Sequence, residues 1–202
     1  MLLDRFLPEY DVSKRHAIEI AAPPSRVFEE LRCYDFGSSL VTGVLIGLRG
    51  YGWRRRRAAE PRDASLSERL VRFGFTLLGE TPGEELVFGV VGRFWRPNGG
   101  LRRISAAEFE SFAEPGFAKA AWNLRVGSGL HLPHGGSGLH LPHSELSTET
   151  RVASFGEATR RKFLLYWRLI EPFSGAIRWS LLRGVRRAAL HRPDEPREHR
   201  RT

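Results

Sequence analysis

FLLYWRLIEPFSGAIRWSLL, residues 163–182, is the stretch of sequence that decides the fold. Its apolar residues recur at steps of three and four, which is the spacing of one stripe along a helix. Pro172 is expected to kink this helix, because it lacks an N–H and crowds the carbonyl of Arg168. A helix with so long an apolar stripe must be covered by another element. The stripe consists of Phe163, Trp167, Ile170, Phe173, Ile177, Leu181 and Val185.

The layer that covers this helix is predicted to be an antiparallel β-sheet. Upstream segments alternate apolar and polar residues with a period of two, as half-buried strands do. Two runs of strand-forming residues flank the turn sequence TPGE at 81–84 and form the clearest hairpin of the chain. A further short strand is expected at LRRIS, residues 101–105. The alternating segments are 13–22, 117–126 and 145–152.

Short helices are predicted between these strands. PPSRVFEELRCY, residues 23–34, opens with proline and places its apolar residues on one helical face. SSLVTGVLIGLRG, residues 38–50, offers a serine cap and a second helical pattern that its glycines weaken. A polar helix is expected around 106–114. The sequence therefore predicts two short helices directly after the first strand.

Two pairs of residues have the spacing of a capping box, in which a serine side chain accepts the backbone amide three residues later. Ser65 and Glu68 predict the start of a short helix. Ser154 and Glu157 repeat the spacing, and predict the start of the long C-terminal helix.

Length and composition indicate one soluble domain. With 202 residues and 41% hydrophobic content, the chain can bury a core without staples. Residues 1–190 are assigned to this domain, and 191–202, with both signs of charge and two prolines, to a disordered basic tail. Cys33 is the lone cysteine, which favours a reducing, cytoplasmic compartment, and we expect it in the core. No secretory signal is recognised, and the longest apolar stretch, 40–48, is too short to span a bilayer.

The formal charge of +9 raises the question of an anionic partner, and WRRRR at 53–57 sharpens it. Nearly all basic residues are arginines, however, and no zinc-finger spacing or aromatic RNA-binding motif accompanies them. A solvated basic loop is the favoured interpretation, because net charge governs solubility and weak association before function. The sequence therefore predicts no specific nucleic-acid partner, and leaves open a weak association with anionic membranes.

The order of elements from about 13 to 189 resembles that of the START-like helix-grip superfamily, which includes polyketide cyclase-like and lipid-transfer-like proteins. The local similarity lies in IEIAAPPSRVFEEL (18–31), LSTETRV (146–152) and the 163–182 stretch. The resemblance implies an α+β fold in which a curved antiparallel sheet wraps around a long C-terminal helix. It also implies a cavity between sheet and helix for an apolar or amphipathic small molecule. The segment 58–73 and the long loop at 127–144 depart from the family pattern.

Strand alternation and the helical stripe identify the side chains expected to line this cavity. The first hairpin adds none, because both of its faces are apolar and neither can be assigned as inward. Core packing is the commoner fate of such residues. Three hydroxyl-bearing members stand out, because a few polar groups in an apolar wall are typical of ligand sites. The candidate ligand-binding residues are Trp122, Leu124, Thr148, Thr150, Phe163, Tyr166, Ile170 and Phe173.

The sequence favours binding over catalysis. Acyl transfer requires a nucleophile, a base and an orienting group close together, and Cys33 has no evident basic partner. No Gly-x-Ser-x-Gly turn or glycine-rich phosphate loop occurs, so no catalytic residue and no cofactor is predicted. His16 could act as an acid or base, but a structural histidine is the favoured interpretation.

Residues 127–144 read GSGLHLPHG GSGLHLPHS, a nine-residue unit written twice with one change. The repeat carries two HxxH pairs, enough imidazoles for a zinc or nickel ion. The geometry argues against a dedicated site, since Pro133 and Pro142 disfavour a helix that would align each pair. No metal is therefore predicted, and the repeat is interpreted as an insertion at a hairpin tip. The weaker metal candidates are His131, His134, His140 and His143.

Three functions follow in order of preference. The first is binding of a lipid-like or aromatic small molecule in the cavity, and the second is a cyclase-like or hydrolase-like enzyme using the same cavity. The third is a basic surface adaptor for anionic membrane or nucleic acid. The sequence leaves the identity of the ligand and the oligomeric state open.

Overall fold

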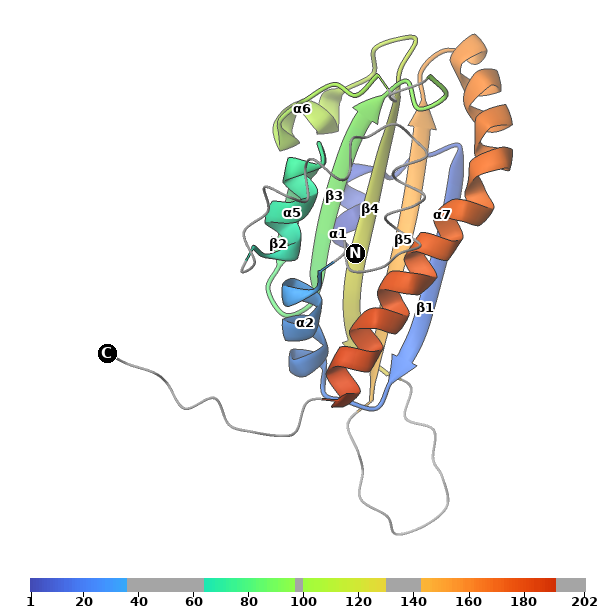
Figure 1. Cartoon of the computed structure of the whole chain (residues 1–202). Helices are drawn as coiled ribbons and strands as arrows, with labels where there is room; N and C mark the ends of the chain where they lie inside the picture. Colours follow the sequence, from blue (N-terminus) through green and yellow to red (C-terminus); the bar gives the residue numbers. More distant parts are fainter. Residues whose placement is uncertain (36–63, 97–99, 130–142, 192–202) are drawn as a thin grey trace.

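The computed structural model describes residues 1–35, 64–96, 100–129 and 143–191 (Figure 1). These ranges contain one sheet, one long helix and several short helices. The helices are α1 (Leu2–Phe6), α2 (Pro24–Cys33), α5 (Leu66–Arg72), α6 (Ala106–Ser111) and α7 (Glu157–His191). The strands are β1 (Val12–Ile20), β2 (Thr76–Thr81), β3 (Glu85–Gly92), β4 (Ala118–Ser128) and β5 (Ser144–Ser154).

The five strands form one open antiparallel sheet in the order β1-β5-β4-β3-β2. Pairing of β1 with β5 places the first strand beside the strand that leads into α7. Helix α7 then crosses the sheet (Figure 1). The predicted α+β class, with an antiparallel sheet and a long C-terminal helix in a helix-grip layout, is confirmed.

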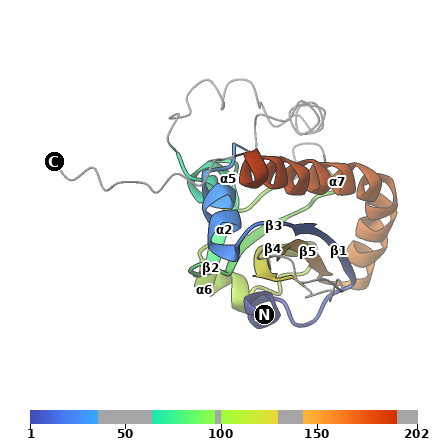
Figure 2. The same cartoon turned by 90° about the horizontal axis from the view of Figure 1, so that it is seen from below.

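Helices lie on both faces of the sheet (Figure 2). One core cluster joins α2, α5 and α7 to the sheet through residues such as Phe88, Leu124 and Leu181. A second cluster joins α1 and α6 to the opposite face through Leu3, Val87 and other residues. The sheet is therefore the middle layer of the molecule.

This arrangement explains why the sequence of the first hairpin does not show which of its faces points inward. Every residue of β3 is buried, because its alternate side chains enter different cores. Leu86 and Phe88 point to the cluster beneath α7, whereas Val87 and Val91 point to the cluster beneath α1 and α6. A strand covered on both faces has no polar side to alternate with.

The turn between β2 and β3 is formed as the sequence predicts. Gly83 has a φ of +78°, and the N–H of Glu84 donates to the carbonyl of Thr81 at 3.0 Å. A type II turn requires a positive φ at its third position, which glycine supplies, and proline is common at its second position.

One of the two predicted capping boxes is present. Ser65 Oγ accepts the amide of Glu68, and Glu68 accepts the amide of Ser65. The prediction for Ser154 was wrong, because this residue still belongs to β5 and its amide donates to Asp11 Oδ2 at 2.8 Å. Helix α7 begins at Glu157, after Gly156 has turned the chain with a φ of +91°.

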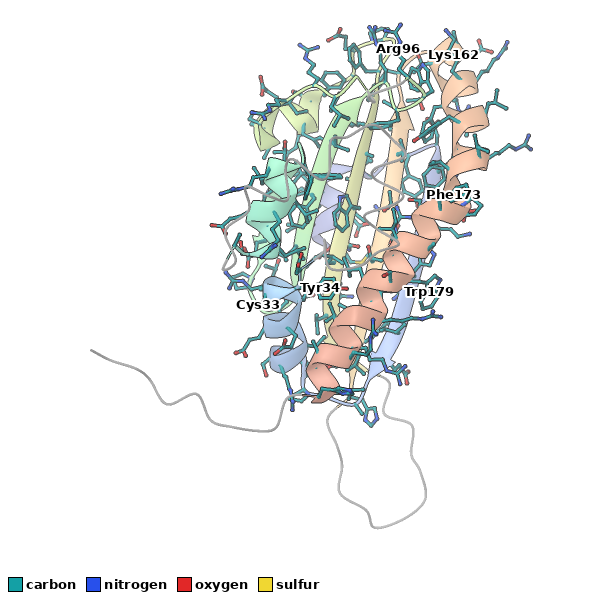
Figure 3. All side chains as sticks on the ribbon, viewed as in Figure 1. Cys33, Tyr34, Arg96, Lys162, Phe173 and Trp179 are labelled. Atoms are coloured by element: carbon teal, nitrogen blue, oxygen red, sulfur yellow. The ribbon has the colours of Figure 1, made fainter. Side chains whose placement is uncertain are left out.

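The remaining predictions of helices, strands and core residues have different outcomes. Helix α2 follows the first strand as expected, but the second helix predicted at 38–50 lies outside the described residues. LRRIS contributes a single bridge between Arg102 and Val91 instead of a strand. Cys33 is exposed at the end of α2, so its prediction as a core residue was wrong (Figure 3). None of the helices in the described ranges combines the length and apolar character that crossing a membrane requires.

Candidate ligand-binding site

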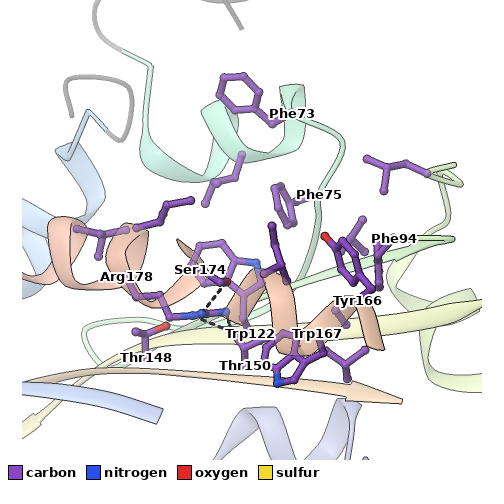
Figure 4. Close-up of a pocket in the computed structure, with 18 of the residues that line it drawn as sticks. Phe73, Phe75, Phe94, Trp122, Thr148, Thr150, Tyr166, Trp167, Ser174 and Arg178 are labelled. Atoms are coloured by element: carbon purple, nitrogen blue, oxygen red, sulfur yellow. Dashed lines mark hydrogen bonds between the residues drawn. The ribbon is translucent and has the colours of Figure 1, made fainter. Parts of the chain in front are cut away.

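A cavity of about 230 Å³ lies between α7 and the face of the sheet formed by β3, β4 and β5 (Figure 4). The end of α5 and the residues that follow it close one side, through Leu70, Phe73 and Phe75. Phe94 and Leu101 contribute to the wall beyond β3. The cavity therefore lies under α7, between the helix and the sheet.

Aromatic side chains dominate the wall. Trp122 projects from β4 and contacts Phe75 edge-on at a ring-centroid distance of 5.9 Å. From α7, Phe163 and Trp167 lie 5.9 Å apart by ring centroids. The Nε1 of Trp122 is buried and has no hydrogen-bond partner within the described ranges. The wall is thus mainly apolar, with few hydrogen-bonding groups.

The polar groups of the cavity gather where β5 faces the middle of α7. Arg178 Nη2 and Nε donate to Thr150 Oγ1 at 2.7 and 3.1 Å, and Nη1 donates to Ser174 Oγ at 2.8 Å (Figure 4). Thr148 Oγ1 donates to the backbone carbonyl of Asn123 at 2.6 Å, so its hydrogen is already used within the sheet. The hydroxyls of Thr150 and Ser174 instead hold the guanidinium of Arg178 in place.

Arg178 is the one charged residue among the side chains that line the cavity in the described part of the chain. Burial lowers the pKa of Arg178 to about 10, and the nearby charge of Glu171 opposes that shift. A guanidinium with this pKa is still protonated at neutral pH, so the cavity carries a full positive charge.

Elementary periodicity explains how these residues come together. Trp122 pairs with Thr150 across β4 and β5, and the period of two places Leu124 and Thr148 on the same face. On α7, Phe163, Ile170 and other cavity residues recur at steps of three and four. Both the strand pair and the helix therefore present one continuous face to the cavity.

Seven of the eight predicted ligand-binding residues line the cavity. Phe173 does not, because 47% of its surface is exposed and its side chain lies outside the wall. The residue that follows it, Ser174, takes the place on the cavity side four residues after Ile170. The seven residues in the wall are Trp122, Leu124, Thr148, Thr150, Phe163, Tyr166 and Ile170.

Ser174 and Arg178 were missed because the stripe was selected for apolar residues. Their spacing nevertheless points to them, since they lie four and eight residues after Ile170. A polar residue at a position where the helical period requires burial is the signal that finds them.

Of the four histidines of the repeat, His143 lies in the described part of the chain, and it does not line the cavity. His143 is exposed beside the end of the β4–β5 hairpin, where its carbonyl accepts the amide of Gly129 at 2.9 Å. His131, His134 and His140 lie outside the described residues. No group of three or more histidine, cysteine or acidic side chains within the described ranges is placed to hold a metal ion.

The cavity wall also limits the chemistry available. No carboxylate, imidazole or thiol occurs among the described residues that line it. His16 lies on β1 with its ring edge-on to Trp179, at a centroid distance of 5.6 Å, and is not part of the wall. The arrangement can enclose the apolar part of a molecule and donate hydrogen bonds to a polar group near Arg178.

Comparisons with known proteins give no relative for this chain: no family model, no curated protein and no solved structure matches it.

Proposed function

We propose that this protein binds a hydrophobic or amphipathic small molecule in the cavity between α7 and the sheet. The observation that carries the proposal is an apolar, aromatic-lined space with a cluster of polar groups around Arg178. Ligand pockets in proteins commonly have this composition. The resemblance to START-like proteins supports the same function, since their cavity lies in the corresponding layer.

The size of the cavity indicates the size of the ligand. An apolar cavity of about 150 Å³ accepts benzene. The space under α7, at about 230 Å³, is roughly half as large again. A bicyclic aromatic compound or a medium-length alkyl chain matches this volume better than a full phospholipid does.

Binding is preferred to the cyclase-like or hydrolase-like alternative because of the groups in the wall. General acid–base catalysis uses a side chain that can exchange a proton near neutral pH. Arg178 remains protonated and the other polar members are hydroxyls of Thr148, Thr150, Tyr166 and Ser174. These groups orient a ligand without supplying a base.

Native mass spectrometry of protein purified from its own host tests the proposal. The wild-type chain should carry a small adduct that is released on unfolding. Ala120→Phe places a ring in the cavity and should abolish the adduct while the protein stays folded. Ala176→Phe adds the same ring at an exposed position of α7 and should keep the adduct. An adduct retained equally by both variants would place the ligand elsewhere.

A second candidate function is docking on an anionic membrane, and one feature of α7 favours it. Leu165, Leu169 and Phe173 form an outer stripe at four-residue spacing, with 73%, 71% and 47% of their surfaces exposed. Apolar side chains beside basic ones are typical of helices that lie at a membrane interface. The exposed basic neighbours on the same helix are Arg161, Lys162 and Arg168.

Co-sedimentation with vesicles tests this second candidate. Wild-type protein should pellet with vesicles of phosphatidylcholine and phosphatidylglycerol, but less with phosphatidylcholine alone. Replacing Leu165 and Leu169 with serine should abolish pelleting, whereas Leu190→Ser, at another exposed leucine of α7, should not. Equal pelleting of all three proteins would exclude the outer stripe as the docking surface.

A further inference from the structure

Arg178 is a largely buried cation that has no ion-pair partner in the part of the chain that the structure describes. No carboxylate in the described part of the chain forms an ion pair with it. Glu171 is the acidic group whose charge reaches Arg178, but its carboxylate already pairs with Lys14 at 2.8 Å. Burial of an uncompensated charge is unfavourable, so buried charges in proteins are normally paired. Among the described residues, the charge of Arg178 is offset only in part, by the more distant Glu171.

Arg178 and the two hydroxyls that it binds have hydrogen-bond donors left over. An arginine carries five N–H donors, and three of them bind the hydroxyls of Thr150 and Ser174, which leaves two. Since both hydroxyl oxygens accept from Arg178, their own hydrogens are free to donate. Neither hydroxyl has an acceptor for that hydrogen among the described residues. An acceptor-only group is what this cluster lacks.

From this cluster we infer that the ligand is an amphiphile with a carboxylate, which binds Arg178, Thr150 and Ser174 while its apolar part lies along the aromatic wall. The inference rests on the proposed function and specifies the ligand class. A carboxylate is acceptor-only and matches the planar fork of a guanidinium, where charge-assisted bonds are about twice as strong as neutral ones.

A carboxylate fits this site better than a phosphate. A phosphate monoester carries close to two negative charges at neutral pH. Arg178 supplies one positive charge, and no second cation lines the cavity in the described ranges. Lys14 already forms an ion pair with Glu171. His16 lies outside the wall, and burial lowers its pKa. A ligand group with a single negative charge therefore matches the single positive charge of Arg178.

Isothermal titration at pH 7 with octanoate and octan-1-ol separates this inference from the proposed function. The two probes share one alkyl chain and differ in the carboxylate. Wild-type protein should bind octanoate at least about tenfold more tightly than octanol, the gain expected from one charge-assisted pair. Arg178→Met should remove that preference and still bind octanol. Arg178→Lys keeps the charge but loses the fork, and should lie between the two.

Each outcome has a definite meaning. Equal affinity of wild-type protein for the two probes would overturn the inferred carboxylate and leave the cavity as a binding site for neutral molecules. An octanoate preference that survives in a folded Arg178→Met variant would also overturn it, because the anion would then bind elsewhere. Failure of wild-type protein to bind either probe would overturn the proposed function together with this inference.

Discussion

The buried position of Arg178 lowers the stability of the folded protein, but it suits the residue to binding an anionic group of a ligand. Its guanidinium lies in an apolar wall, with two hydroxyl groups as its hydrogen-bond partners. Natural proteins tolerate groups that reduce stability where function requires them. Its pKa of about 10 means that its ionisation adds no pH dependence to stability near neutral pH. The charge is a constant cost to the folded state until the pH approaches 10.

Replacing Arg178 with methionine should therefore raise the stability of the ligand-free protein or leave it unchanged. Exchange of buried ionic groups for apolar ones of similar volume is often neutral or stabilising by about 1–4 kcal/mol. In a chain of this size, 1 kcal/mol shifts Tm by about 2–4 °C. Calorimetry of delipidated wild-type and variant proteins measures the change. A fall in Tm of several degrees would show that Arg178 serves the fold and not a ligand.

His16 gives the protein a pH-dependent component of stability in the mildly acidic range. Burial lowers its pKa below the ordinary value of 6.5, with the charges of Arg178 and Lys14 acting in the same direction. As the pH falls from 6.5 towards this lowered pKa, the unfolded chain binds a proton that the folded chain does not. The free energy of unfolding should therefore decrease as the pH falls through this window.

Urea denaturation at a series of pH values from 7 to 5 checks this expectation. His16→Gln should flatten the part of the profile just below pH 6.5, because glutamine does not titrate. His191→Gln, at an exposed position at the end of α7, provides the matched control and should leave that part unchanged. Identical slopes for wild type and His16→Gln would contradict the assignment.

At the scale of the element, α7 shows how far periodicity predicts a site. The three-and-four spacing correctly places Phe163, Trp167 and Ile170 on the cavity side. It fails at Phe173, because a period of 3.6 residues allows either the third or the fourth residue after Ile170 to face inward. An apolar criterion then selects phenylalanine, whereas Ser174 occupies that side in the structure. Polar binding residues are hidden from a search for apolar stripes.

Helix α7 also depends on a glycine where α2 meets it. A Cβ added at Gly184 would lie against Tyr34 Oη and 2.6 Å from its Cε2, so Ala cannot be accommodated without a shift of the ring. Gly184→Ala should therefore destabilise the protein by about 1–3 kcal/mol through overpacking. Chemical denaturation measures this loss.

Gly175 on the same helix provides the control for Gly184. Its added Cβ would meet His16 Nε2 at 3.5 Å, an ordinary contact. Gly175→Ala should stabilise the protein by up to about 1 kcal/mol, because alanine is the better helix former. Similar effects of the two substitutions would show that the contact between α2 and α7 is looser than described.

At the scale of the whole molecule, the sequence predicts the α7 side of the sheet better than the opposite side. Helix α1 has only five residues, too few for a periodic pattern to identify. Tertiary contacts hold it instead. Glu85, buried in β3, accepts the amide of Leu2 at 2.8 Å, and Asp4 pairs with Arg151 of β5 at 2.8 Å. Such contacts depend on the folded arrangement and leave no local signal in the sequence.

The cavity itself is a property of the whole molecule. Strand alternation and helical spacing predict which side chains face the space under α7, and seven of the eight lie in the wall. Whether facing side chains fill the space or leave it open depends on how α5, α7 and the sheet pack together. The open volume and the donor cluster around Arg178 can therefore be identified only from the structure.

A crystal structure of the protein with 8-bromooctanoate tests the central claim, that the space under α7 holds an amphipathic ligand. Anomalous scattering from bromine should give one peak inside the cavity, near Trp122, Phe163 and Ile170, with the carboxylate beside Arg178. A bromine peak on the outer stripe of α7, or a cavity closed by its own side chains with no bromine bound, would contradict the account.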